Sequence, residues 1–356
     1  MKKFLLNSEF QDTANFFEEI VGRKENTVVS EMDIHNYYQS KRIMIIGAGG
    51  TIGSSVARKL ILSGVKNVYF LDRDESALHA LALSISDSAA SHSDKCIVAD
   101  IKDLTGIKLI FEKYKPDLIL HAAALKHLVI LERFQREGFI TNVVGTYNLL
   151  LAAKEYNVKQ FINVSTDKAA NPTSFLGKTK KITELITEIF NTENKMRTCS
   201  VRFGNVFASR GSVIETFIHQ IENDIPVTLT DLLVTRYFMS HDEAANLILA
   251  AGIMSTNGVL VQNMGNEVLL TQIIANLSRY MNKEFKTNII GLQFGEKLRE
   301  ELYADLFTDT NIEEIVRIDI KRFPKLLTSL SSCMNPESNE QALNYTESLL
   351  SERNEI

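Results

Sequence analysis

The chain has 356 residues, with a hydrophobic content of 45%, a charged content of 23% and a formal net charge of −5. A chain of this length can bury a large core, and its composition is that of an ordinary soluble globular protein, so we expect two lobes and a cytoplasmic location. The lack of a long Lys/Arg tract argues against nucleic-acid binding, and the lack of an apolar run of about 18 residues argues against a membrane span. The three cysteines lie far apart, so neither a disulfide framework nor a metal site is predicted.

Residues 1–40 are predicted to form a helical N-terminal extension, with the strongest helical pattern from Phe10 to Val21. Nothing in this extension indicates chemistry. We expect it to pack against the main domain or against a neighbouring subunit of a homo-oligomer, since terminal segments stay ordered only where something holds them.

A glycine-rich turn follows the first predicted strand, Lys41–Ile46, and precedes a helical pattern. In such a βαβ unit the first glycine allows a tight turn, the second lets the backbone approach a pyrophosphate, and the third lets helix and strand pack closely. The free N–H groups and the partial positive charge of the helix N-terminus favour phosphate. The sequence therefore predicts a dinucleotide site, whose expected contacts here are Gly47, Gly50, Thr51, Ile52 and Gly53.

The second predicted strand ends at Asp72, whose carboxylate can accept hydrogen bonds from both ribose hydroxyls and would repel a 2′-phosphate. This favours NAD over NADP. NADP remains an alternative cofactor because of Arg73, since an arginine at this position can pair with the 2′-phosphate. Asp100 and Ile101 follow the third strand, where Asp100 either meets the adenine or caps the next helix.

The fourth predicted strand, Asp117–Leu120, opens into the stretch HAAALKH. Three small residues of this stretch, Ala122, Ala123 and Ala124, permit close approach of the ribose on the nicotinamide side. Lys126 and His127 lie just beyond and could reach a substrate, whereas His121 is interpreted as structural. Asn142 would be costly to bury unpaired, so we expect it to hold the backbone of the site open.

The fifth predicted strand ends in a cluster of reactive side chains. A helix begins near Leu176, and Leu176 and Lys180 share one face of it because they are four residues apart. Two lysines, an aspartate and two hydroxyls thus converge on one strand end. A nicotinamide enzyme is expected to have a tyrosine at position 176, and leucine cannot move a proton. The expected catalytic positions are Thr166, Asp167, Lys168, Leu176 and Lys180.

Later segments add polar groups on the substrate side. Arg236 is the best candidate for a phosphate clamp, because a guanidinium matches phosphate oxygens in bidentate fashion. Gly291–Leu298 is predicted to open a late helix at a possible anion site. The residues expected to contact substrate are Lys126, His127, Asn205, Ser212, Val213, Arg236 and Glu296.

The alternation of strands and helices up to about residue 200 predicts an α/β fold, a doubly wound parallel sheet (Rossmann) with a smaller C-terminal substrate-binding lobe. The predicted division is an N-terminal extension at 1–40, an NAD-binding domain at 41–230, an interleaved substrate-binding lobe at 231–330 and a polar tail at 331–356.

Six motifs together resemble a known family, the nucleotide-sugar 4,6-dehydratases within the extended short-chain dehydrogenases/reductases. These enzymes serve bacterial polysaccharide biosynthesis and act on UDP-N-acetylglucosamine. The resemblance extends over about residues 16–305, and the stretch Ile20–Arg23 resembles the lead-in of the long, membrane-anchored members, here without the membrane part. The motifs are HAAALKH at 121–127, TNVVGT at 141–146, VSTDKAANPTSFLGKTK at 164–180, RFGNVFASRGSVI at 202–214, TRYFM at 235–239 and GLQFGEKLREEL at 291–302.

The resemblance implies an internal redox cycle, in which bound NAD takes the C4 hydride, water leaves across C5 and C6, and the hydride returns to C6. By position, Lys168 would remove the C5 proton, Asp167 would protonate the departing C6 hydroxyl and Thr166 would hydrogen-bond the C4 oxygen. Lys180 would bind the nicotinamide ribose and lower neighbouring pKa values. The family further implies that Asn205, Ser212 and Arg236 hold the sugar nucleotide.

Three departures from the family pattern leave alternatives open. Leu176 stands where the short members have tyrosine and many long members have methionine, so C4 deprotonation falls to Lys168, to Thr166 with a water, or to Lys180. Gln293 and Phe294 replace an Arg-Pro pair, and Lys178 is larger than the usual residue. The alternatives are a sugar-nucleotide epimerase, a dehydratase that also inverts C5, and a non-catalytic NAD or sugar-nucleotide binding protein.

Overall fold

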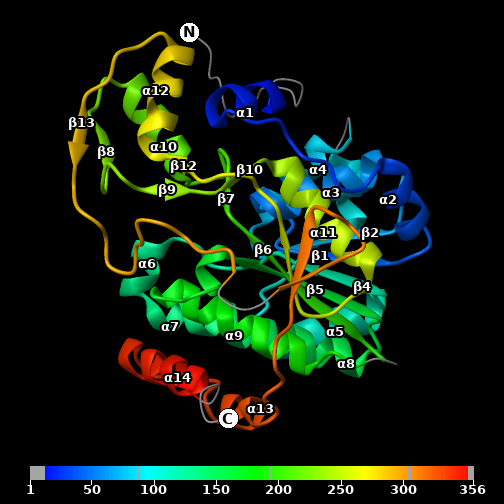
Figure 1. Ribbon diagram of the computed structural model, residues 1–356. Coiled ribbons are helices and arrows are strands. Elements are labelled where there is room, and N and C mark those ends of the chain that lie inside the picture. The colour runs from blue at the N-terminus through cyan, green and yellow to red at the C-terminus, as the bar shows by residue number, and fades with distance from the viewer. Residues whose placement is uncertain (1–12, 87–88, 193–194, 304–306, 352–356) are drawn as a thin grey trace.

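The computed structural model describes residues 13–86, 89–192, 195–303 and 307–351, and its centre is a sheet in the order β14-β15-β11-β6-β5-β4-β1-β2-β3 (Figure 1). Neighbours from β3 to β11 pair in parallel, whereas β15 runs antiparallel to both β11 and β14. The strands are β1 Ile43–Ile46, β2 Val68–Asp72, β3 Cys96–Val98, β4 Leu118–His121, β5 Gln160–Thr166, β6 Arg197–Phe203, β11 Val259–Gln262, β14 Phe307–Asp309 and β15 Ile315–Ile318.

Helices cover both faces of this sheet, which explains why β1 is an uninterrupted apolar run with every residue buried. One face carries α2 Glu31–Tyr38, α3 Thr51–Leu62, α4 Glu75–Ser84 and α11 His241–Met254. The other carries α5 Leu104–Tyr114, α8 Gly145–Glu155 and α9 Phe175–Ile189. The prediction of a doubly wound parallel sheet is confirmed.

The strand order reverses between β1 and β4, since β2 and β3 continue to one side of β1 and β5 and β6 to the other side of β4. Ligands of open α/β sheets bind in the crevice at such a reversal, beyond the carboxyl ends of the strands. Short elements follow β4, β5 and β6 at this edge, namely α6 Leu128–Arg133, α7 Gln135–Gly138, the π-helical turn η3 Phe139–Val144, the 3₁₀ turn η4 Asp167–Ala169 and β7 Asn205–Val206.

A smaller lobe has its own apolar core, to which Phe217, Leu229 and Ile273 contribute. It lies beside the carboxyl edge of the large sheet (Figure 1). Its elements are α10 Val213–Glu222, β8 Val227–Leu229, β9 Thr235–Arg236, β10 Phe238–Met239, β12 Val268–Leu269, α12 Leu270–Met281 and β13 Thr287–Ile289.

The N-terminal extension divides between the two lobes. Helix α1, Thr13–Val21, buries Phe17 and Ile20 in the core of the small lobe. Helix α2 packs on helices α3 and α11 of the large lobe, and the hydroxyl of buried Tyr38 donates to the Leu249 carbonyl of α11 at 2.7 Å. The extension therefore links both lobes within one chain.

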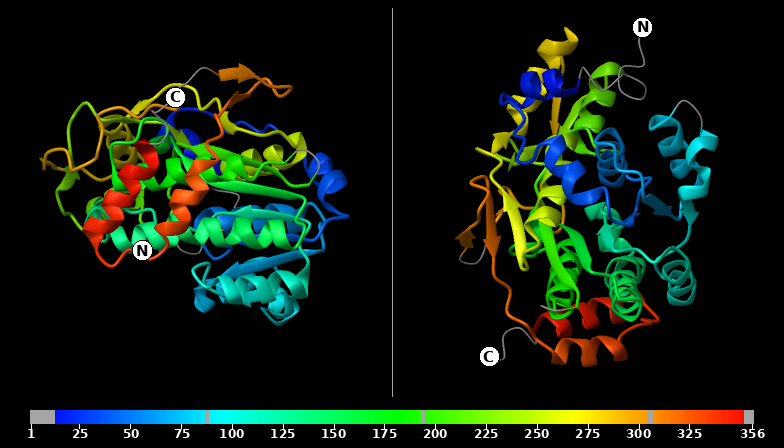
Figure 2. Two further views of the ribbon diagram at one scale, coloured as in Figure 1. Left: turned by 90° about the horizontal axis from the view of Figure 1, so that it is seen from below. Right: turned by 90° about the vertical axis from the view of Figure 1, so that its right-hand side faces the viewer.

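The C-terminal residues form α13 Lys325–Ser332 and α14 Asn339–Ser351, which lie along the outer side of α9 (Figure 2). Residues 331–356 were expected as a polar tail. Helix α14 nevertheless buries Ala342, Thr346 and Leu349, which recur at helical spacing, while its acidic residues Glu340 and Glu347 face solvent.

The prediction of a helix opening at Gly291–Leu298 is wrong, because this stretch consists of loop and turns. Gly291 and Gly295 have φ values of +81° and +76°, in the left-handed region that interrupts a right-handed helix. In the ranges that the structure describes, no helix combines the length and apolarity needed to cross a bilayer.

Candidate active site

The glycine-rich segment from the end of β1 into α3 leaves no room for side chains at two of its glycines. Gly47 has φ +82°, and a Cβ there would approach the Ala123 nitrogen to 2.6 Å. A Cβ on Gly53 would overlap the Gly47 carbonyl. The backbone is thus brought close to the N-terminus of α3, where the free N–H groups can meet a pyrophosphate.

A pocket of about 230 Å³ opens at this turn, between the ends of β1, β2 and β4. It brings together most of the residues predicted for the cofactor, and Thr51 and Ile52 occupy the first turn of α3 beside it. The lining includes Gly47, Gly50, Asp72, Arg73, Asp100, Ile101, Ala122, Ala123 and Ala124.

Two features of this pocket fit a dinucleotide. Asp72 is held at the end of β2 by accepting hydrogen bonds from the backbone N–H groups of Gly49 at 2.9 Å and Asp74 at 3.1 Å. The Thr141 hydroxyl is buried in the lining and has no hydrogen-bond partner among the described residues. An orphaned buried hydroxyl in a cavity indicates a ligand that supplies its partner.

Sequence reasoning missed Arg210 and Thr141, which also line the pocket. Arg210 comes from the segment after β7, and its backbone N–H donates to Thr51 Oγ1 at 3.2 Å. Both residues lie inside the motifs TNVVGT and RFGNVFASRGSVI, so these motifs were the available signal.

Asp100 does not cap a helix. Its carboxylate accepts a hydrogen bond from the Lys102 N–H at 3.0 Å, and Asp103 caps α5.

Asn142 holds the backbone after β4, as predicted. Its Oδ1 accepts from the Leu125 N–H at 2.8 Å, and its Nδ2 donates to the Leu125 carbonyl at 3.0 Å and to Thr179 Oγ1 at 3.2 Å.

His121 is buried, and its Nε2 lies 2.9 Å from Thr146 Oγ1. Burial first, and the charge of Lys180 second, lower the pKa of His121 to about 3, so its ring is neutral.

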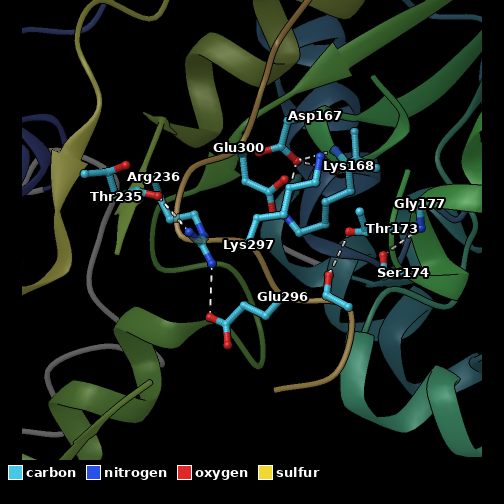
Figure 3. Close-up of polar contacts among 12 residues, drawn as sticks. Asp167, Lys168, Thr173, Ser174, Gly177, Thr235, Arg236, Glu296, Lys297 and Glu300 are labelled. Atoms are coloured by element: carbon cyan, nitrogen blue, oxygen red, sulfur yellow. Dashed lines mark hydrogen bonds and ion pairs between the residues drawn. The ribbon is translucent and has the colours of Figure 1, made fainter. Parts of the chain in front are cut away.

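The Asp167–Lys168 pair lies at the end of β5 (Figure 3). Asp167 is 1% exposed, and its Oδ1 accepts from Thr166 Oγ1 at 2.7 Å and from Lys168 Nζ at 3.1 Å. Its Oδ2 is buried without a hydrogen-bond partner in the described part of the chain. That oxygen is therefore open to a substrate hydroxyl.

Lys168 contacts a second carboxylate, since its Nζ lies 3.4 Å from Glu300 Oε1. Burial would lower the pKa of Lys168, but the charges of Asp167 and Glu300 outweigh it and hold the pKa above its ordinary value. Lys168 is thus an ammonium in the free protein. Sequence reasoning missed Glu300.

Helix α9 carries Leu176 and Lys180 past this pair. Ser174 caps the helix by accepting from the Gly177 N–H at 3.1 Å. Leu176 is 6% exposed and belongs to the apolar core beneath the site. Lys180, one turn later, is equally buried, and burial lowers its pKa to about 8 although Glu184 opposes the shift.

An ionic network lies under the strand end, and sequence reasoning did not find it. Arg202 is fully buried and donates to Glu184 through Nε and Nη2, both at 2.8 Å. Glu184 also accepts from Ser165 Oγ at 2.7 Å. Although burial would raise the pKa of Glu184, the charge and hydrogen bonds of Arg202 outweigh it and lower that pKa. The network ties α9, β5 and β6 together.

The substrate side has two separate groups of predicted residues. Arg236 Nη2 donates to Glu296 Oε1 at 3.0 Å (Figure 3). Thr230 Oγ1 donates to the same oxygen at 3.0 Å. The second group lies around the start of α10, where Ser212 caps the helix and Val213 begins it. Lys126 Nζ reaches Ser209 Oγ at 3.5 Å, and burial lowers the pKa of Lys126.

Two more predicted substrate residues are placed by the backbone and by packing. Asn205 pairs with Phe238 where β7 meets β10. The His127 ring packs against Gly211, next to the capping residue of α10.

Comparison with known proteins places this geometry in a family. A family model described as polysaccharide biosynthesis protein matches residues 43–320. The capsular polysaccharide biosynthesis protein CapD of Staphylococcus aureus is 38% identical over 271 residues, 74% of this chain and 45% of CapD. The probable polysaccharide biosynthesis protein EpsC of Bacillus subtilis is 34% identical over 290 residues, 80% of this chain and 48% of EpsC. The chain thus spans about half the length of these relatives.

Among solved structures, Pen from Bacillus thuringiensis superposes with a TM-score of 0.67 at 30% identity, covering 75% of this chain and 83% of Pen. The family match extends from β1 to the end of the described sheet, and so includes both the dinucleotide pocket and the Asp167–Lys168 pair. The chain belongs to the polysaccharide biosynthesis protein family, within the extended short-chain dehydrogenases/reductases.

Proposed function

We propose that the chain is a nucleotide-sugar 4,6-dehydratase that converts UDP-N-acetylglucosamine into a UDP-4-keto-6-deoxy-N-acetylhexosamine with NAD bound. The observation that carries this proposal is the Asp167–Lys168 pair, whose aspartate is buried, at the end of β5, next to the strand β4 whose end lines the dinucleotide pocket. Removing water across C5 and C6 needs a base for carbon and an acid for oxygen, and this pair supplies both groups.

The pocket at the β1–β4 reversal supports NAD as the cofactor. Asp72 presents a carboxylate where the adenosine ribose would lie, and the glycine turn brings backbone N–H groups to the pyrophosphate. Lys180 would hold the nicotinamide ribose. When bound, NAD accepts a hydride from C4 and returns it to C6.

The pair can generate both catalytic groups in one proton transfer. Lys168 is an ammonium in the free protein, so it must lose a proton before it can act as a base. Asp167 Oδ1, 3.1 Å from Lys168 Nζ, is the hydrogen-bonded acceptor. The transfer leaves a neutral amine to take the C5 proton and a carboxylic acid to protonate the C6 hydroxyl, while Thr166 hydrogen-bonds the C4 oxygen.

Incubation of the purified protein with UDP-N-acetylglucosamine tests the proposal by product mass. Loss of one water supports dehydration. A product that is an isomer of the substrate, with unchanged mass, would instead indicate an epimerase. A sugar nucleotide that binds but is not converted would indicate a non-catalytic binding protein. The buried Leu176 at the tyrosine position favours this last alternative.

A further inference from the structure

Glu300 is a buried carboxylate beside Lys168 that none of the steps above uses. It is 4% exposed, and its Oε1 lies 3.4 Å from Lys168 Nζ, on the same nitrogen that Asp167 contacts (Figure 3). Burying a carboxylate costs free energy unless a cation compensates, and in the described part of the chain Lys168 is the cation with which Glu300 forms an ion pair.

The fold fixes the backbone on both sides of Glu300. Two residues before it, the Leu298 carbonyl accepts from the Thr235 N–H at 2.9 Å and from Arg236 Nη1 at 3.2 Å. Two residues after it, the Leu302 carbonyl accepts from Nη1 of the buried Arg202 at 3.2 Å. The buried arginine network therefore also anchors the loop that carries Glu300.

We propose that Glu300 is a positioning residue for Lys168 in the elimination step, so that Asp167, Lys168 and Glu300 act as a unit. This inference rests on the proposed function. When Asp167 holds the proton destined for water, Glu300 is the carboxylate that remains charged beside Lys168. Lys168 then takes the C5 proton, and the C5–H electron pair forms the C5=C6 double bond as the C6 oxygen takes the Asp167 proton and leaves as water. Glu300 stabilises the positive charge that develops on Lys168.

Glu300→Gln tests this role by removing the charge and keeping the shape. We expect water loss to slow about 100-fold, as for the removal of one group that stabilises developing charge. Oxidation at C4 through Thr166 with a water, or through Lys180, does not use Glu300, so reduced cofactor should accumulate in a single turnover and be visible in its near-ultraviolet absorbance. Glu300→Asp keeps the charge at a greater distance and should restore part of the rate.

Glu301→Gln is the matched control, because it makes the same change of charge at the next residue, which is exposed. It should behave as the wild type. The inference is overturned if Glu300→Gln loses water at the rate of Glu301→Gln, or if it slows oxidation and water loss equally without accumulating reduced cofactor. A wild-type protein that never releases water overturns the proposed function, and this inference with it.

Discussion

The cofactor side of the site differs in its construction from the side proposed for water elimination, which is called the elimination side below. The cofactor side centres on backbone and small residues of one strand–turn–helix unit, such as Gly47 and Gly53. The elimination side joins Lys168 to Glu300, which belongs to a distant segment; both carry a charge, and Glu300 is buried. The integrity of the cofactor side therefore depends on the volume of its side chains, and that of the elimination side on the balance of its charges.

The largest effect is expected on the elimination side. Lys168→Ala should lower turnover at least about 1000-fold, because the proposed base for the C5 proton is lost, whereas NAD binding should persist. Product mass spectrometry and cofactor titration measure the two quantities separately. Lys178→Ala, which breaks a contact between α9 and Glu347 away from the pair, is the control. Equal turnover in both variants would show that Lys168 is not the base.

A volume change should instead disable the cofactor side. Gly53→Val places atoms on the Gly47 carbonyl, so we expect the free energy of unfolding to fall by about 3 kcal/mol. We also expect NAD binding to become too weak to measure. Gly291→Ala meets open space and strains only the backbone, at about 1 kcal/mol. Urea unfolding and cofactor titration test both. Equal losses for the two variants would contradict the claim that close packing sets this side.

Lys180 lies between the two sides, and its charge should appear in the pH dependence of stability. Its pKa is about 8 in the folded chain against an ordinary value of 10.5, so between these values the unfolded chain binds more protons. Folding stability should then rise with pH across this window, by up to about 3 kcal/mol relative to Lys180→Met. Below pH 8 the difference between the two should be constant. Parallel urea-unfolding profiles throughout would contradict the expected shift.

The smallest effect is expected at Leu176. Leu176→Met conserves volume in an apolar core, so stability should change by less than about 1.5 kcal/mol and turnover should remain largely intact. A large rise in turnover for Leu176→Met, or for Leu176→Tyr, would show that the native protein is a weakened enzyme. Thermal unfolding and product formation are the measurements.

The same contrast explains what the sequence could predict. The glycine turn, Asp72 and the small residues after β4 follow from local patterns, since strand, turn and helix are adjacent in the chain. Lys168 and Lys180 could also be predicted as site residues, because Lys168 follows a predicted strand end and Lys180 lies on the helix face that begins at Leu176. Glu300 and Arg202 were missed, because their partners come from other segments and an isolated charged residue carries no local signal.

The one wrong helix has an equally local cause. The sequence pattern predicts a helix at Gly291 and Gly295, although both adopt left-handed backbone that prevents one. Residues 331–356 are predicted as a polar tail, and helix α14 within them is mainly polar because only one of its faces is buried. Composition alone does not distinguish a solvated helix face from an unstructured end.

Deuterium incorporation tests the central claim most directly. The wild-type protein is incubated with UDP-N-acetylglucosamine in heavy water, and the product is analysed by mass and by the position of the label. The Asp167–Lys168 account predicts loss of water and one deuterium at C5, because the proton returned to C5 exchanges with solvent through Lys168. A product of unchanged mass, or one that has lost water without deuterium at C5, would contradict it.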